Sequence, residues 1–149
     1  MELRKKHLKK EDLTACAKEM MLAFHIEPWN ENWTFEQAYT RIEEIMSSDV
    51  SRGYVIYDGD LVVSMMCGRI MTYLDHKELW IDDLSVHPDY QGLGIGTQLL
   101  DYVKQEMKEE GVLYLLLNTT RGFGCVDFYK KNGFEELTHI ITLASDVRL

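Results

Sequence analysis

Glycines are concentrated in one short segment that could bind an anion. It reads Gln91-Gly92-Leu93-Gly94-Ile95-Gly96-Thr97 and lies between an expected strand, stopped by Pro88, and an expected helix. Glycines let backbone N–H groups converge on a phosphate, and a helix N-terminus adds positive potential. The segment therefore predicts a phosphate or pyrophosphate site that needs no lysine. The alternative is a turn that only packs a helix closely on a strand, but glycines at three alternate positions exceed what such a connection needs.

Two common nucleotide-binding fingerprints do not fit this segment. The dinucleotide pattern G-x-G-x-x-G requires glycine where Thr97 stands, and the P-loop requires a lysine after Gly96. The sequence therefore disfavours a dinucleotide-dependent oxidoreductase. A measurement that shows NADH binding would support that hypothesis again.

Three blocks in order identify a resemblance. Gln91-x-x-Gly94-x-Gly96 resembles the Q/R-x-x-G-x-G/A motif of the GNAT superfamily of acetyl-CoA-dependent N-acetyltransferases. The block from Asp82 to Pro88 resembles that family's fourth strand and its exit, and the block from Phe128 to Phe134 is similar to its F/L-Y-x-K-x-G-F segment. The spacing fits from about Tyr54 to Phe134, and the N-terminal part fits more loosely. The resemblance implies an α/β GNAT fold, with a mixed, mostly antiparallel sheet flanked by helices and splayed between strands four and five.

The resemblance also implies a coenzyme A site with acetyl-CoA as co-substrate and no metal. The pyrophosphate would sit on backbone amides of the glycine turn, and the pantetheine arm would bond to the backbone of the fourth strand. By position, Asn118 could contact the arm from the other side, or it could simply be a turn-forming residue. The implied set is Leu84, Ser85, Val86, Gln91, Gly92, Leu93, Gly94, Ile95, Gly96, Thr97, Asn118, Tyr129 and Lys131.

The implied catalytic residues are a tyrosine and a carboxylate. Tyr129 would protonate the departing thiolate, and the alternative is an aromatic core residue. An alkyl amine attacks only as the neutral form, so a base is needed. Asp83 is preferred and Asp82 is second, with a water relay left open. Strand alternation would turn the two carboxylates to opposite faces unless a bulge intervenes. They could instead bind a cationic substrate or solvate a strand end.

The acceptor-binding site would be shaped by the segment between the first two helices. Its Glu27 and Trp29, with Asp83, form a sensible wall for an amine through ion-pair and cation–π contacts. The alternative is helix-end packing and surface charge. A small-molecule acceptor such as an aminoglycoside or polyamine, an amino-acid derivative, or a peptide or protein amine all remain open.

One family position departs from the pattern. The family often has Asn seven residues before the tyrosine and Ala between them, where this chain has Gly122 and Cys125. Cys125 suggests a ping-pong route in which it carries the acetyl group, but no histidine stands near it in sequence. Direct attack in a ternary complex is the predicted mechanism, and a non-catalytic acyl-CoA-binding regulatory module is the rival.

The elements that must position these residues are predicted from periodicity. Strands are expected near 3–8, 54–57, 61–73, 79–86 and 112–117, and helices near 11–27, 34–46, 95–110 and 126–131. Thr34 and Gln37 form a capping box, with Trp33 and Ala38 placed as a hydrophobic staple. The apolar run 112–117 predicts a central strand buried on both faces. Residues 134–143 predict a closing hairpin or a long last strand.

Composition bounds the remaining possibilities. A chain of 149 residues without repeats or linkers suits a single N-acetyltransferase domain over 1–149. The net charge of −9 disfavours nucleic acid as a partner. No apolar run is long enough to span a membrane, and the start lacks a secretory signal. The scattered cysteines Cys16, Cys67 and Cys125 indicate neither a disulfide framework nor a zinc site, so a cytoplasmic location is expected. A homodimer is compatible with the sequence, which does not specify the oligomeric state.

Overall fold

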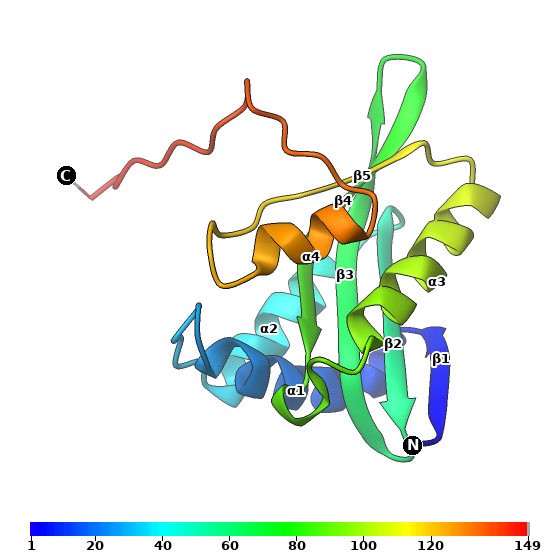
Figure 1. Ribbon diagram of the computed structural model, residues 1–149, viewed down its shortest axis with the longest axis vertical. Coiled ribbons are helices and arrows are strands. Elements are labelled where there is room, and N and C mark those ends of the chain that lie inside the picture. The colour runs from blue at the N-terminus through cyan, green and yellow to red at the C-terminus, as the bar shows by residue number, and fades with distance from the viewer. Residues whose placement is uncertain (149) are drawn as a thin grey trace.

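The computed structural model describes residues 1–148, which form one five-stranded sheet with helices on both faces (Figure 1). The strands follow each other in chain order, β1-β2-β3-β4-β5. Pairing is antiparallel from β1 to β4 and parallel between β4 and β5. The elements are β1 (Leu3–His7), η1 (Lys10–Asp12), α1 (Leu13–His25), α2 (Phe35–Ile45), β2 (Ser51–Asp58), β3 (Leu61–Tyr73), β4 (His76–Val86), η2 (Pro88–Tyr90), α3 (Ile95–Glu109), β5 (Tyr114–Leu117) and α4 (Cys125–Lys131).

Alternation along the strands divides the core into two layers. On β2, Tyr54 and Ile56 face α3, whereas Val55 and Tyr57 face α1 and α2. The apolar stripe of α3 includes Leu99 and fills the first layer. Because successive strand residues point to opposite faces, a strand that is apolar at every position needs helices on both sides. Residues 54–57 of β2 and 65–67 of β3 have this pattern, and both stretches lie in the interior of the sheet.

Local signals place the helix ends as expected. Thr34 accepts a hydrogen bond from the backbone N–H of Gln37, and the Gln37 side chain accepts one from the backbone N–H of Thr34, which completes the predicted capping box. Ala38 is fully buried in the second layer. Near the start of α1, the buried Asp12 carboxylate accepts hydrogen bonds at 2.6 Å from the Tyr57 hydroxyl and from the Lys6 ammonium. These bonds tie the first helix to β1 and β2.

Two predictions at the end of the chain are wrong. β5 is an edge strand rather than a central one, and its first residue, Tyr114, is 57% exposed. The apolar run is split, because Val112 packs under α3 while Leu113 is 62% exposed. The segment 134–143 forms no strand and leaves the molecule beside α4 (Figure 1). A local apolar pattern gives strand propensity but cannot specify which distant edge, if any, supplies a pairing partner.

Candidate active site

The sheet opens where β4 and β5 part. Their parallel pairing runs from Glu78 with Tyr114 to Ile81 with Leu117 and stops there. The last part of β4, residues 82–86, continues alone on that side while its other edge stays paired with β3. Unpaired backbone N–H and C=O groups along a strand edge can bind an extended amide-containing chain by strand addition. This opening is the predicted splay, and it contains the backbone of Leu84 and Val86.

The glycine turn lies at the end of that open strand. Gly92 and Gly94 have φ angles of 77° and 79°, and a methyl group added to either would meet no atom within 4 Å. Both glycines are therefore required by backbone conformation and not by crowding. Gly94 is the N-cap of α3 and provides no side-chain cap, so the first amides of the helix are available for an anion. The Gln91 side chain donates a hydrogen bond of 3.2 Å to the carbonyl of Val86, which fastens the turn to β4.

The third glycine of the turn has a different role. A Cβ on Gly96 would lie 2.8 Å from the tip of the Phe128 ring, so this glycine lets α4 approach the start of α3. Of the three glycines, Gly96 alone is therefore explained by close packing, which was the alternative explanation for the whole turn. Ile95 is 1% exposed and belongs to the core, so only its backbone is open to a ligand. The side chains of Leu93, Thr97, Asn118 and Lys131 are exposed.

A β-bulge places the two carboxylates. The register between β3 and β4 shifts at Cys67 and Gly68, so that Cys67 pairs with Asp83 and Gly68 pairs with Ile81. The extra residue is Asp82. A bulge interrupts the regular alternation of side chains between the two faces of a strand. Both carboxylates lie beside basic side chains. Asp83 accepts two hydrogen bonds from Arg41 at 2.7 and 3.0 Å, and Asp82 accepts two from Arg69 at 2.9 Å.

The environment of Asp83 raises its pKa. Its side chain is 9% exposed, and burial raises the pKa of Asp83 above its usual value, although the Arg41 guanidinium opposes that rise. A carboxylate of raised pKa holds a proton more readily than an ordinary one. Arg41 was not among the residues expected from the sequence. Its partner lies 42 positions away, so no local spacing could reveal it.

A second buried carboxyl supports the same strand. Glu19 on α1 is 2% exposed and accepts a hydrogen bond of 2.7 Å from the Ser85 hydroxyl, while its other oxygen has no partner among residues 1–148. Burial raises the pKa of Glu19 to about 8. The Ser85 side chain is therefore engaged with α1, which leaves only its backbone for the expected cofactor contact. Sequence reasoning missed Glu19, because a single acid inside an apolar helix face carries no motif.

Tyr129 lies in an aromatic cluster on α4. Its ring meets Phe128 and Phe134 edge-on, with centroids 5.0 and 5.4 Å apart. Burial raises the pKa of Tyr129 to about 12, so the hydroxyl keeps its proton at neutral pH. Phe128 links the helix of Tyr129 to Gly96 of the turn.

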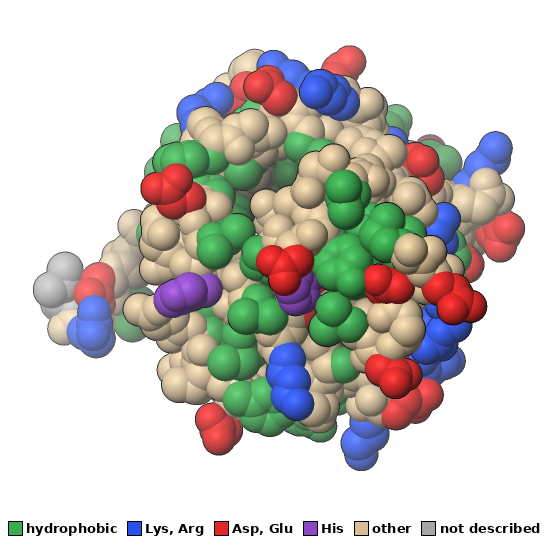
Figure 2. Space-filling view, turned by 60° about the horizontal axis from the view of Figure 1, so that its bottom comes forward, with side chains coloured by type: hydrophobic (Ala, Val, Ile, Leu, Met, Phe, Trp, Pro, Cys, Tyr) green, Lys and Arg blue, Asp and Glu red, His purple; other side chains and the backbone are tan. Residues whose placement is uncertain are grey.

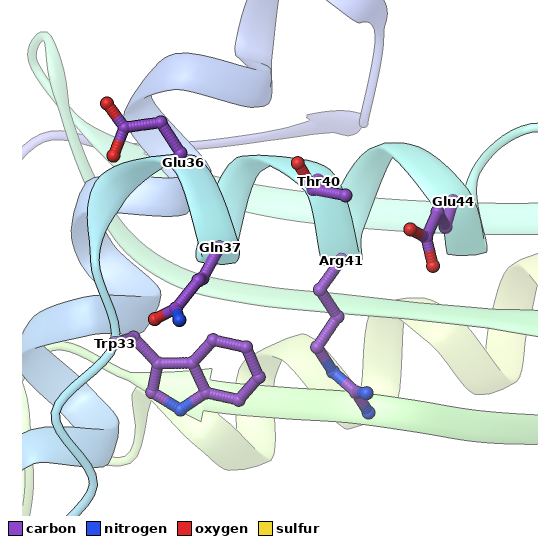
Figure 3. Close-up of a pocket in the computed structure, with 6 residues that line it drawn as sticks. All are labelled: Trp33, Glu36, Gln37, Thr40, Arg41 and Glu44. Atoms are coloured by element: carbon purple, nitrogen blue, oxygen red, sulfur yellow. The ribbon is translucent and has the colours of Figure 1, made fainter.

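The structure shows no contact that joins the expected acceptor residues Glu27 and Trp29 to Asp83 among residues 1–148. Glu27 and Trp29 are exposed in the α1–α2 connection, where Trp29 packs edge-on against Phe24 at 5.6 Å. A shallow depression of about 460 Å³ lies instead along α2 (Figure 3). In that view Trp33, Gln37 and Arg41 project to one side of the helix. The depression is lined by Trp33, Glu36, Gln37, Thr40, Arg41 and Glu44.

This depression adjoins the carboxylate pair through a shared residue. Arg41 lines it and also binds Asp83, and its guanidinium lies 5.9 Å from the centroid of the Trp33 ring. The spacing of Glu36, Thr40 and Glu44 at every fourth position is a signal that could have indicated a polar stripe on α2. The aromatic and acidic lining suits a cationic ligand.

Among residues 1–148, no three or more His, Cys, Asp or Glu side chains cluster in a way that could hold a metal ion. In the same range, no helix has both the length and the apolar character needed to span a membrane.

Comparison with known proteins identifies the protein family. A model of the "Acetyltransferase (GNAT) family" matches residues 18–134. The chain belongs to the GNAT acetyltransferase family. Its splayed sheet and glycine turn agree with that membership.

The sequence identity to individual proteins is low. The "Probable N-acetyltransferase san" of Drosophila melanogaster is 32% identical over 84 residues, which are 53% of this chain and 44% of that protein. The chain thus spans less than half the length of this relative. Among solved structures, an aminoglycoside acetyltransferase from an uncultured soil metagenomic sample, in complex with sisomicin, has a TM-score of 0.77 at 16% identity, covering 97% and 96% of the two chains. The aminoglycoside N-acetyltransferase AAC(6')-Iy in complex with CoA has a TM-score of 0.75 at 14% identity, covering 97% and 95%. Both structures support the fold.

Proposed function

We propose that this protein transfers the acetyl group of acetyl-CoA to a primary amine by direct attack in a ternary complex. The observation that carries the proposal is the stretch of β4, residues 82–86, that has no partner on its β5 side and is followed, after η2, by the open glycine turn. One end can bond to an amide chain and the other to a pyrophosphate. Coenzyme A has both parts, joined in that order. The solved neighbour with bound CoA supports the assignment of this ligand.

The residues around the opening have separate roles in the reaction. Acetyl-CoA supplies an activated acetyl thioester. The amine nitrogen forms a bond to the acetyl carbon as the carbon–sulfur bond breaks. Asp83 accepts the proton that the amine loses, directly or through water, with Asp82 as the second candidate. Tyr129 donates its hydroxyl proton to the departing sulfur, and the phenol regains a proton from solvent. Holding both reactants in one cleft removes much of the entropic part of the barrier.

The acceptor that fits best is a small cationic amine. Glu36 and Glu44 supply negative charge along the α2 depression, and Trp33 supplies an aromatic wall. Glu27 and Trp29 would extend this wall from the connection before α2. The neighbour bound to sisomicin is an example of this fold that binds an aminoglycoside.

The experiment is thiol release from acetyl-CoA across a panel of amines, with Tyr129→Phe as the matched variant. The panel holds aminoglycosides, polyamines, amino acids and a lysine peptide. We expect turnover on one cationic class and a kcat about 100-fold lower in the variant, since proton donation to the departing sulfur is removed. Tight coenzyme A binding without turnover on any amine would instead indicate a non-catalytic acyl-CoA-binding module.

A further inference from the structure

The Asp83 carboxylate is covered by a single side chain. Both of its oxygens accept hydrogen bonds from Arg41, Oδ2 from Nε at 2.7 Å and Oδ1 from Nη2 at 3.0 Å. The Asp83 side chain is buried, whereas that of Arg41 is 41% exposed, so the guanidinium is the part of the pair that meets solvent. A base must lie within hydrogen-bond reach of the proton that it accepts. An amine that approaches from solvent therefore reaches Asp83 only after Arg41 moves.

Arg41 has other favourable positions on its own helix. Its guanidinium lies 5.9 Å from the centroid of the Trp33 ring, a distance at which a cation is attracted to an aromatic face. Glu44 follows three residues later on α2, and side chains at that spacing are neighbours on a helix surface. All three side chains line the α2 depression (Figure 3). Arg41 can therefore leave Asp83 without losing every favourable contact.

An ionised Asp83 needs a positive partner at all times. A buried charge that loses its partner is strongly destabilised. Among residues 1–148, Arg41 forms the one ion pair of Asp83. Burial raises the pKa of Asp83, and the nearby acids Asp82 and Glu31 add to that rise. The other titratable groups near this part of β4 offer no free cation, since they are the thiol of Cys67 on β3, the carboxyl of Glu19 on α1, and Arg69, which is bound to Asp82. A replacement for Arg41 therefore has to come from outside the protein.

The overall charge attracts cations without selecting among sites. The chain carries a net charge of −9, which favours the approach of any cation. In Figure 2 acidic side chains lie interspersed with basic ones over the face that is seen. Discrimination between a cationic and a neutral amine must therefore come from a local contact, and the Arg41–Asp83 pair is such a contact.

We propose that Arg41 is a specificity-determining residue, which covers Asp83 until the ammonium group of a protonated acceptor takes its place. This role of Arg41 rests on the proposed function and narrows its acceptor to amines that arrive as cations. The bound ammonium gives one proton to the Asp83 carboxylate, which leaves a neutral amine able to attack and a neutral carboxyl. Loss of that proton to solvent lets Arg41 return. An amine that is already neutral has no charge to exchange and leaves Arg41 in place.

Nitrogen NMR of the arginine side chains follows the exchange directly. The Nε–H of Arg41 donates to Asp83 and that of Arg69 donates to Asp82, so each should give a signal protected from exchange with water. Arg41→Gln and Arg69→Gln assign the two signals. The probes are spermidine and benzylamine, which are cations at neutral pH, and aniline, which resembles benzylamine in shape but is neutral. We expect both cations to shift the Arg41 signal and to remove its protection. The Arg69 signal should stay as it is, and aniline should change neither.

Steady-state kinetics give a second readout. In Arg41→Gln no guanidinium has to be displaced, so above the acid limb of the pH profile the KM for a cationic acceptor should fall about 10-fold or more, with kcat little changed. Because the guanidinium no longer opposes burial, the acid limb caused by Asp83 should move to higher pH. A merely structural arginine would not produce this pair of changes. Arg52→Gln is the matched control, since it removes another two-pronged arginine–carboxylate pair, with Glu110, and it should leave KM and the acid limb unchanged.

Each readout can overturn the proposal. Cations that leave the Arg41 signal unmoved, aniline that moves it as the cations do, or movement of the Arg69 signal in its place would each refute the exchange. A KM that is unchanged or raised in Arg41→Gln above the acid limb would refute it as well. The NMR titration needs neither turnover nor coenzyme A. A chain that shows the exchange but transfers no acetyl group supports the displacement of Arg41 and counts against the proposed function.

Discussion

The β-bulge beside Asp83 depends on a glycine whose replacement should harm both stability and catalysis. A Cβ on Gly68 would lie 2.1 Å from the backbone carbonyl oxygen of Trp80, whereas ordinary contacts begin at 3.4 Å. In Gly68→Ala, β3 and β4 would have to separate by about 1.3 Å at this point. The obstacle is backbone and cannot rotate away. We therefore expect the upper part of the overpacking range, a loss of about 3 kcal/mol in the free energy of unfolding.

The expected loss translates into two measurements. For a chain of this size, ~1 kcal/mol lowers Tm by about 2–4 °C, so calorimetry should show a fall of about 6–12 °C. Because Asp82 and Asp83 sit at the bulge, a displacement of about 1 Å should also lower kcat/KM about 100-fold in the thiol-release assay, measured where the variant is folded.

Gly59→Ala is the control for conformational strain alone. Gly59 has a φ of 59° and open space around an added methyl group, so it should lose about 1 kcal/mol and keep full activity. If Gly68→Ala melts within about 2 °C of wild type, the close approach of the two strands is refuted. If Tm falls while kcat/KM stays unchanged, the bulge does not position the carboxylates.

Three further predictions concern buried carboxyl groups. Asp83→Asn should lower kcat/KM about 100-fold and abolish the rise of activity as pH increases through the raised Asp83 pKa. Asp82→Asn should have a smaller effect in the same pH profile. Equal effects of the two variants would contradict the assignment of the base. Because Glu19 keeps its proton to about pH 8 when folded but ionises near 4.5 when unfolded, the free energy of unfolding in urea should decline as pH rises through that window, and Glu19→Gln should remove the decline. Burial alone would raise the pKa of Asp12, but its hydrogen-bond donors outweigh burial and lower it, so its stabilisation is present at neutral pH and lost as pH falls below about 4; Asp12→Asn should cost about 1–3 kcal/mol at pH 7 in the same titration and flatten the acid limb.

What the sequence determined by itself was local. Alternation separated the two core layers on β2, helical spacing located the stripe of α3, and the hydrogen bonds of Thr34 and Gln37 set the start of α2. Gly92 and Gly94 signalled a turn that needs left-handed backbone. Each of these signals acts between residues a few positions apart, where spacing in the sequence is spacing in space.

What only the tertiary structure decided were contacts between distant residues. Arg41 meets Asp83 across 42 positions and Glu19 meets Ser85 across 66. Gly68 became necessary only once the carbonyl of Trp80 lay against it. The edge position of β5 was decided in the same way, because strand pairing is chosen among all available edges and not by the strand's own residues. The protonation of the buried carboxyls follows from those contacts, since a pKa responds to burial and partners that exist only after folding.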